Sequence, residues 1–157
     1  MADTAVGVRG PGATGEAPMN TAERRLRATA AVFAVAVVVH GADHVRRGID
    51  VATDVVRDAG ATQAVLVAIA VVLVFRRHRL APLVAAIVGF VSAVGFGAAH
   101  LLPHWSAFSD PFTGTAVAPG VTAFSWLTAV FEIAAGVAFA IAGLRLMKEE
   151  RNARHTP

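Results

Sequence analysis

The sequence predicts an all-α protein, a bundle of four transmembrane helices with both termini in the cytoplasm. Three observations lead to this prediction. The chain is 55% hydrophobic and 16% charged, whereas soluble domains carry about a quarter charged residues. Its apolar residues form four long runs, and lysine and arginine gather at the ends of those runs. At 157 residues there is room for one domain, which we expect to be a multi-pass protein of the cytoplasmic membrane with the lipid bilayer as its main partner.

Composition also excludes several classes of protein. The absence of cysteine excludes disulfides, thiolate metal sites and cysteine nucleophiles. The net charge is +3, but the basic residues lie at the ends of apolar runs and form no surface interleaved with aromatic residues. We therefore expect no nucleic-acid partner. No nucleophile, base and acid lie together in a water-accessible segment, which disfavours a hydrolase.

The elements follow in chain order. Residues 1–23 are rich in glycine, alanine and proline without periodicity, which predicts a disordered N-terminal tail. The membrane domain is expected over residues 24–148, with a cytoplasmic tail over 149–157. A hydrocarbon core of about 30 Å needs about 20 helical residues. The apolar runs predict helices over about residues 27–45, 59–76, 80–103 and 119–147.

The first run and the segment after it each allow two interpretations. Basic ERRLR before an apolar run is typical of a signal peptide, but VVVHGADH offers no cleavage site of small residues, so we predict a retained helix. The segment GIDVATDVVRDAG, residues 48–60, has apolar residues at helical spacing. It is predicted either as a short amphipathic helix on the outer surface or as a solvated loop.

The distribution of positive charge predicts the orientation. Trp105 and Trp126 fall near the outer ends of the third and fourth helices, as interfacial aromatic residues do. On that outer side the basic residues are Arg46, Arg47 and Arg57. Cytoplasmic segments carry an excess of lysine and arginine. The predicted inner side holds all the others: Arg9, Arg24, Arg25, Arg27, Arg76, Arg77, Arg79, Arg145, Lys148, Arg151 and Arg154.

Small residues predict close contacts between helices. The third run carries them at four-residue intervals, from Ala85 through Gly89 to Gly97, and the fourth run carries Gly136 and Gly143. Such spacing lets membrane helices approach closely. Because the whole chain is rich in alanine, this pattern predicts a compact bundle without identifying which helices pair.

Four of the six histidines form two matched H-x-x-x-H pairs. These pairs, HGADH at residues 40–44 and HLLPH at 100–104, end the first and third helices at the same face of the membrane. Residues four apart project from one face of an α-helix. Neutral imidazoles bind transition metals, and a nearby carboxylate orients a ring. The predicted ligands are His40, His44, His100 and His104. Asp43 is predicted to orient one of these rings without binding the metal itself.

Three interpretations of these histidines stay open. They bind a transition metal ion such as zinc, copper, iron or nickel, they supply the axial ligands of haem b, one from each helix, or they form a hydrogen-bonded structural or pH-responsive cluster. Pro103 lacks a backbone N–H and is able to end the third helix before His104. The zinc-protease motif H-E-x-x-H is excluded, since position 41 is glycine. Asp110, which precedes a proline, is assigned to an ordinary turn.

Glu132 is the single charge in the fourth run and falls near the middle of the bilayer, where a charge costs at least about 2–3 kcal/mol. With Ser125 and Thr128 it forms one polar stripe, and Ser92 of the third helix lies at a matching depth. We predict an intramembrane titrating group. It serves either as a proton carrier or ion ligand, or as a protonated glutamate that ties two helices together.

The motifs HGADHVRRG, APLVAAIVG and AAHLLPHWSAFSDPF resemble those of a group of small integral membrane proteins from high-GC actinobacteria. The resemblance covers the four helices and not the N-terminal tail. It implies a membrane protein and carries no established activity to transfer to this chain.

These features of the sequence suggest three functions. The leading hypothesis is a non-enzymatic or redox-accessory membrane protein that binds a metal ion or haem at its outer face. The first alternative is a small transporter or proton-coupled membrane factor in which Glu132 titrates. The second is a structural subunit that joins a membrane-protein partner or forms a homo-oligomer.

Overall fold

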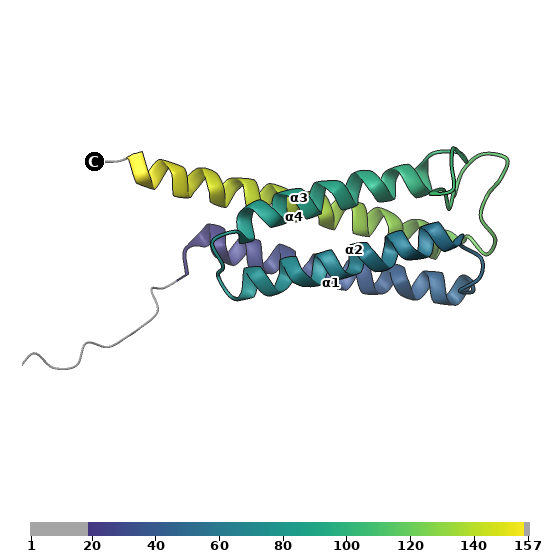
Figure 1. Cartoon of the computed structure of the whole chain (residues 1–157), viewed down its shortest axis with the longest axis horizontal. Helices are drawn as coiled ribbons and strands as arrows, with labels where there is room; N and C mark the ends of the chain where they lie inside the picture. Colours follow the sequence, from purple (N-terminus) through teal and green to yellow (C-terminus); the bar gives the residue numbers. More distant parts are fainter. Residues whose placement is uncertain (1–18, 156–157) are drawn as a thin grey trace, which may run out of the picture.

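A computed structural model describes residues 19–155 and confirms the all-α prediction. Helix α1 spans Thr21–Arg47 and α2 spans Asp54–Phe75 (Figure 1). Helix α3, Ala81–Phe96, continues without a break as a π-helix, η1, over Gly97–Leu101, and α4 spans Ala123–His155. No strand occurs within residues 19–155. The structure is a four-helix bundle, as predicted.

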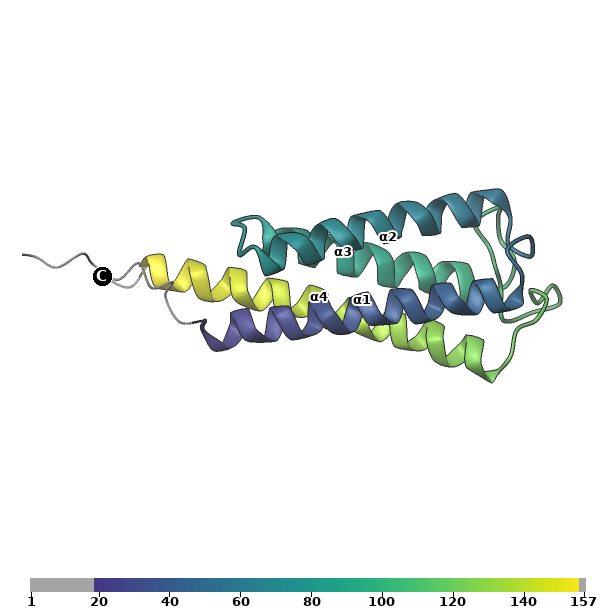
Figure 2. The ribbon, with the colours of Figure 1, turned by 90° about the horizontal axis from the view of Figure 1, so that it is seen from below.

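The helices lie along one common axis (Figures 1 and 2). The start of α1, the turn between α2 and α3 and the end of α4 lie together at one end, which we call the terminal end. The α1–α2 connection, residues 48–53, and the long connection from η1 to α4, residues 102–122, lie at the opposite end, the loop end. Helices α1 and α3 therefore run in the same direction and end at the same depth.

All four helices are long and apolar enough to cross a bilayer, at 27, 22, 21 and 33 residues with η1 counted in the third. They carry large exposed apolar side chains, among them Val38, Val65, Phe90 and Leu127. A helix that is apolar on its outward face as well as its inward one suits a lipid environment. The protein thus has the architecture of a multi-pass integral membrane protein.

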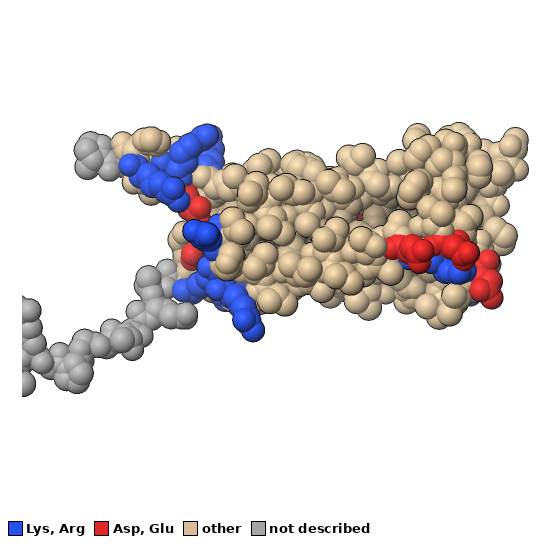
Figure 3. Space-filling model, viewed as in Figure 1, with Lys and Arg blue, Asp and Glu red and all other residues tan. Residues whose placement is uncertain are grey.

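Charged residues gather at the two ends of the bundle (Figure 3). Lysine and arginine dominate the terminal end, whereas acidic residues mix with fewer basic ones at the loop end. This is the asymmetry that the positive-inside rule uses. The cytoplasmic location of the terminal end remains a prediction.

Helices α1, α2 and α4 are longer than predicted. Helix α1 begins at Thr21 because Asn20 and Glu23 form a capping box: the Asn20 side chain accepts from Glu23 N at 2.8 Å, and the Glu23 carboxylate accepts from Asn20 N at 3.0 Å. The end of the predicted disordered tail is therefore helical, while residues 1–18 of that tail lie outside the described residues. Helix α4 continues to His155, through most of the predicted tail over 149–157.

The segment between α1 and α2 matches the predicted loop only in its first part, and no separate surface helix occurs in it. Residues 48–53 form turns, and α2 begins at Asp54, where the Thr53 hydroxyl accepts from Val56 N at 3.2 Å and caps the helix. Residues 54–60, predicted as a surface helix or a loop, are the first turns of a spanning helix.

Glycines bring α3 and α4 into close contact. A Cβ atom at Gly89 would lie 2.4 Å from the backbone oxygen of Gly136, and one at Gly143 would lie 2.5 Å from the oxygen of Pro82. No side chain fits at either position without displacing backbone. The small-residue spacing therefore marks the α3–α4 interface, whereas Gly97, at the end of the same row, has open space around it.

Candidate metal centre

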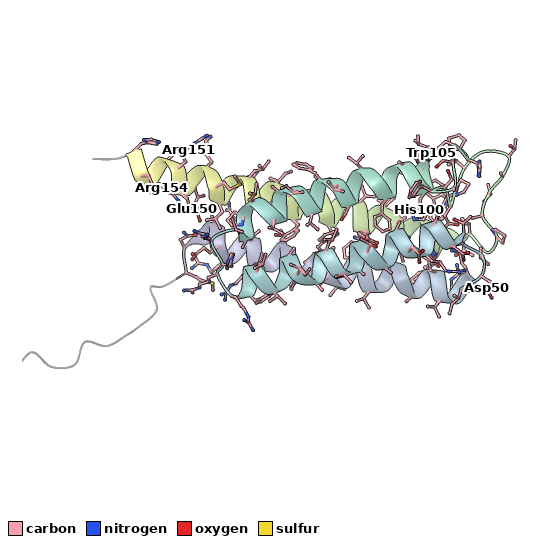
Figure 4. All side chains as sticks on the ribbon, viewed as in Figure 1. Asp50, His100, Trp105, Glu150, Arg151 and Arg154 are labelled. Atoms are coloured by element: carbon pink, nitrogen blue, oxygen red, sulfur yellow. The ribbon has the colours of Figure 1, made fainter. Side chains whose placement is uncertain are left out.

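Three histidines from two helices meet inside the loop end of the bundle. His40 Nε2 lies 3.2 Å from both His44 Nε2 and His100 Nε2. One nitrogen from each ring lies within 4.8 Å of the other two. His40 and His100 are 2% and 1% exposed, and His44 is half-buried. Figure 4 shows His100 between the helices near the loop end. We call these three residues the histidine cluster.

Local backbone geometry brings the rings together. His40 and His44 lie one turn apart on α1, with ring centroids 4.8 Å apart. His100 lies in η1, and the wider turn of a π-helix re-aims side chains relative to the α-helix before it, a feature found often at functional sites. The His100 ring is held between Phe96 and Phe112, at centroid distances of 5.7 and 4.6 Å.

His104 lies outside the cluster, which corrects the predicted set of four ligands. The set of four required α-helical geometry through His104, although Pro103 already marked a position where the helix is able to end. Instead, η1 ends at Leu101, Leu102 is extended with φ −86° and ψ 150°, and Pro103 follows. His104 is consequently an exposed residue of the loop.

Hydrogen bonds on the far side of two rings determine which nitrogen carries the proton. His100 Nδ1 lies 2.9 Å from the backbone oxygen of Asp110, which only accepts, so Nδ1 is the donor. The Thr128 hydroxyl donates to the Ser125 carbonyl at 3.0 Å, so its oxygen accepts from His40 Nδ1, 3.3 Å away. In both neutral rings Nε2 therefore presents a lone pair.

His44 has the opposite tautomer. Arg47 only donates, and its Nη2 lies 3.1 Å from His44 Nδ1, so neutral His44 carries its proton on Nε2 and donates to His40. The Nε2 lone pair of His40 accepts that hydrogen bond, whereas the Nε2 lone pair of His100, 3.2 Å from His40 Nε2, has no donor facing it. Three ring nitrogens that converge inside the bundle form a place for a cation.

A network of charged residues lies next to the histidine cluster and contacts His44 and His100. The buried Arg47 guanidinium pairs with Asp43 at 3.3 Å and makes two hydrogen bonds to the Asp110 carboxylate, one of 3.1 Å. Arg46 also pairs with Asp43, at 2.8 Å. Asp43, predicted to orient an imidazole, instead accepts hydrogen bonds from Arg46 and forms ion pairs with Arg46 and Arg47.

Asp110 has a structural role that turn chemistry does not describe. Its backbone N donates to Ala99 O at 3.0 Å, and Phe112 N donates to His100 O at 2.9 Å, so the loop satisfies the free carbonyls of η1. Burial by itself raises the pKa of the Asp110 carboxyl, but the hydrogen bond and positive charge of Arg47 outweigh that effect and hold the pKa below its ordinary value. The carboxylate therefore stays ionised beside Arg47.

A second polar group lies closer to the middle of the membrane. Gln63 Nε2 lies 3.2 Å from Glu132 Oε1 and 3.3 Å from Ser92 Oγ. Glu132 is 1% exposed, and its Oε2 has no hydrogen-bond partner among the described residues. Ser92 was predicted to lie at the depth of Glu132, and Gln63 bridges the two.

One cavity connects both groups. It has a volume of about 770 Å³ between α1, α2 and α3, and its lining is predominantly apolar. The histidine cluster lies on its wall, and so do Gln63, Ser92 and Glu132. Thr128, which contacts His40, precedes Glu132 by one turn of α4, a rise of about 6 Å.

Sequence reasoning missed Gln63 and the role of Arg47. Gln63 is the one strongly polar side chain inside the second apolar run, a signal that was available, because such a residue in a membrane helix needs a partner. Arg47 looked like one of several basic residues at a helix end. Only its burial against the residue 102–122 loop distinguishes it from Arg46.

Comparison of the chain with known proteins finds no matching family model, no matching curated protein and no matching solved structure.

Proposed function

We propose that this protein is a metal-binding integral membrane protein, in which His40, His44 and His100 hold a first-row transition metal ion. The observation that supports this function is the convergence of three imidazoles inside the bundle, with His40 Nε2 3.2 Å from both His44 Nε2 and His100 Nε2. Zinc–nitrogen bonds of about 2.0–2.1 Å at a tetrahedral angle separate two ligand nitrogens by about 3.3 Å. The two separations from His40 Nε2, both 3.2 Å, match this value.

The three histidines differ in whether the nitrogen that would bind the metal is already unprotonated. His40 and His100 already have unprotonated Nε2 atoms 3.2 Å apart, and each has its far nitrogen hydrogen-bonded, as metal-bound histidines usually do. His44 becomes a ligand through Nε2 when Arg47 releases its Nδ1 and the proton moves there. The remaining coordination positions face the cavity, so the site is of the open type that accepts a further ligand.

Imidazole ligands favour zinc, copper, iron or nickel over magnesium or calcium. Haem b with one axial histidine from each helix fits less well, because nitrogens 3.2 Å apart leave no space for a porphyrin ring between them. A purely hydrogen-bonded cluster, in which His44 donates to His40, leaves the Nε2 lone pair of His100 without a donor, which favours a bound cation.

Metal content tests this function. The detergent-purified protein, loaded with zinc or copper(II) and washed, is expected to retain a single metal ion per chain by elemental analysis, and excess magnesium should not displace it. The double variant His40→Ala/His100→Ala should retain none. The matched control is His78→Ala/His155→Ala, which also loses two histidines but none from the cluster and should bind normally, as should His104→Ala.

Saturation with metal should also raise thermal stability, by about 2.7 kcal/mol at a free concentration 100 times the dissociation constant. Wild-type protein that stays metal-free after loading would overturn the proposal. Equal metal content in the cluster variant and its control would do the same.

We further propose that the terminal end faces the cytoplasm, which places the histidine cluster near the outer face of the membrane. The charge asymmetry supports this orientation. The chain has no cysteine, so single cysteines report on sidedness directly. A membrane-impermeant thiol reagent added to intact cells should label Thr115→Cys, in the exposed loop, and should label Ala153→Cys, near the end of α4, only after lysis. The reverse pattern would invert the orientation.

A further inference from the structure

The Gln63–Ser92–Glu132 group is not needed to hold a metal, and its position in the cavity raises a separate question. Glu132 is 1% exposed in the middle of a membrane helix and has one carboxyl oxygen without a partner. An unsatisfied polar atom in such a place costs several kcal/mol. The cavity it faces is too large and too apolar for packing alone to explain: at about 770 Å³ it falls within the roughly 300–1,000 Å³ of small-molecule sites.

The lining identifies the chemistry of a suitable occupant. Most of it is aliphatic or aromatic, including Val37, Leu66 and Phe108. Polar groups occur at the histidine cluster and the Glu132 group, and Thr62 and Arg57 of α2 also line the cavity. The cavity also includes Val91 and Val94, which are 64% and 72% exposed on the outward surface of α3. Its opening therefore meets lipid, so a molecule dissolved in the bilayer has direct access.

The Gln63–Ser92–Glu132 group determines which polar headgroup a molecule bound in the cavity needs. Gln63 already donates to Glu132 Oε1, so Oε2 remains to be satisfied. An ionised carboxylate there needs a donor, and a protonated one needs an acceptor. A hydroxyl serves in either case because it both donates and accepts. A charged amine or phosphate would have to leave water for an apolar cavity, which is far more costly.

We propose that this cavity binds a bilayer-soluble molecule with an apolar body and a hydroxyl headgroup, and that Glu132 Oε2 receives that hydroxyl. Gln63 and Ser92 hold the carboxyl in place. The site lies about one helical turn from the histidine cluster, so the same molecule reaches the open side of the metal centre, but its binding does not require the metal.

Photo-crosslinking in lipid nanodiscs tests the proposal. The probe is hexadecanol with a diazirine on its alkyl chain, and mass spectrometry maps the labelled peptides. We expect labelling of α2 and α3 at the cavity, which excess hexadecanol suppresses and excess hexadecane does not. Chelator-treated, metal-free wild-type protein should label as untreated protein does, so failure of the metal site and failure of this site are distinguishable.

Two kinds of variant make the test specific. Glu132→Leu should weaken competition by hexadecanol about tenfold or more, and Glu132→Gln, which keeps an oxygen acceptor, should weaken it less. Gly60→Phe adds a side chain to the cavity wall at a position with open space around its Cβ and should block labelling without altering Glu132. Circular dichroism checks that each variant is helical. Equal competition by hexadecane, or unchanged competition in Glu132→Leu, would overturn the proposal.

Discussion

Replacing Arg47 with alanine is expected to lower the free energy of unfolding by about 3–5 kcal/mol. The guanidinium is buried and joins Asp43 of α1 to Asp110 of the 102–122 loop. Without it, the Asp110 carboxylate stays buried with no cation beside it, and the cost of removing one partner of a buried pair exceeds the value of the pair itself. Unfolding by sodium dodecyl sulfate in mixed micelles, followed by circular dichroism, measures the change.

Arg57→Ala is the matched control. It removes the same side chain at the same end of the bundle, but Arg57 is 39% exposed and pairs with exposed Asp50 and Asp54. A surface pair of this kind contributes about 0–1 kcal/mol. A loss in Arg47→Ala no larger than in Arg57→Ala would show that the loop is held by other contacts. The metal affinity of Arg47→Ala is a second readout, because the loop also holds Asp110 against His100.

Gly89→Ala is expected to destabilise the bundle by about 1–3 kcal/mol although it adds a single methyl group. That methyl would lie 2.4 Å from the Gly136 oxygen and 2.8 Å from Ala140 N, so α3 and α4 must separate. Alanine is otherwise the better helix former, by about 1 kcal/mol. A loss of stability in Gly89→Ala therefore has to come from the contact between α3 and α4.

Gly95→Ala, on the same helix with nothing within 4 Å of its Cβ, is the control. It should be neutral or slightly stabilising in the same unfolding experiment. Similar stability of Gly89→Ala and Gly95→Ala would mean that α3 and α4 do not approach as closely as this structure has them.

The local sequence specifies where two of the helices begin, and the predicted helix ranges did not use that information. Asn20 with Glu23, and Thr53 before Asp54, are capping signals that can be found by inspection. The predicted starts followed the apolar runs instead, so α1 and α2 were placed too far along the chain. Capping depends on residues within one turn, and for that reason it was predictable in principle.

The histidine cluster was predictable only in part. Depth follows from counting residues along a spanning helix, so His40, His44 and His100 were expected at one face of the membrane. The exclusion of His104 depends on η1 and on a loop that returns to satisfy its carbonyls. Arg47, Asp110 and Thr128 reach the cluster from three separate parts of the chain, and no spacing in the sequence encodes that meeting.

The sequence by itself determined the class of this protein: four apolar helices, their approximate depth and the asymmetry of charge between the two ends. Those properties depend on bilayer thickness and on residue type, which act on each segment independently. Only the tertiary structure decided that α3 and α4 pair through glycines, that three histidines rather than four converge, and that Glu132 faces a cavity shared with them. These features depend on which faces of separate helices meet, and in a chain so rich in alanine many pairings look alike until the packing itself is seen.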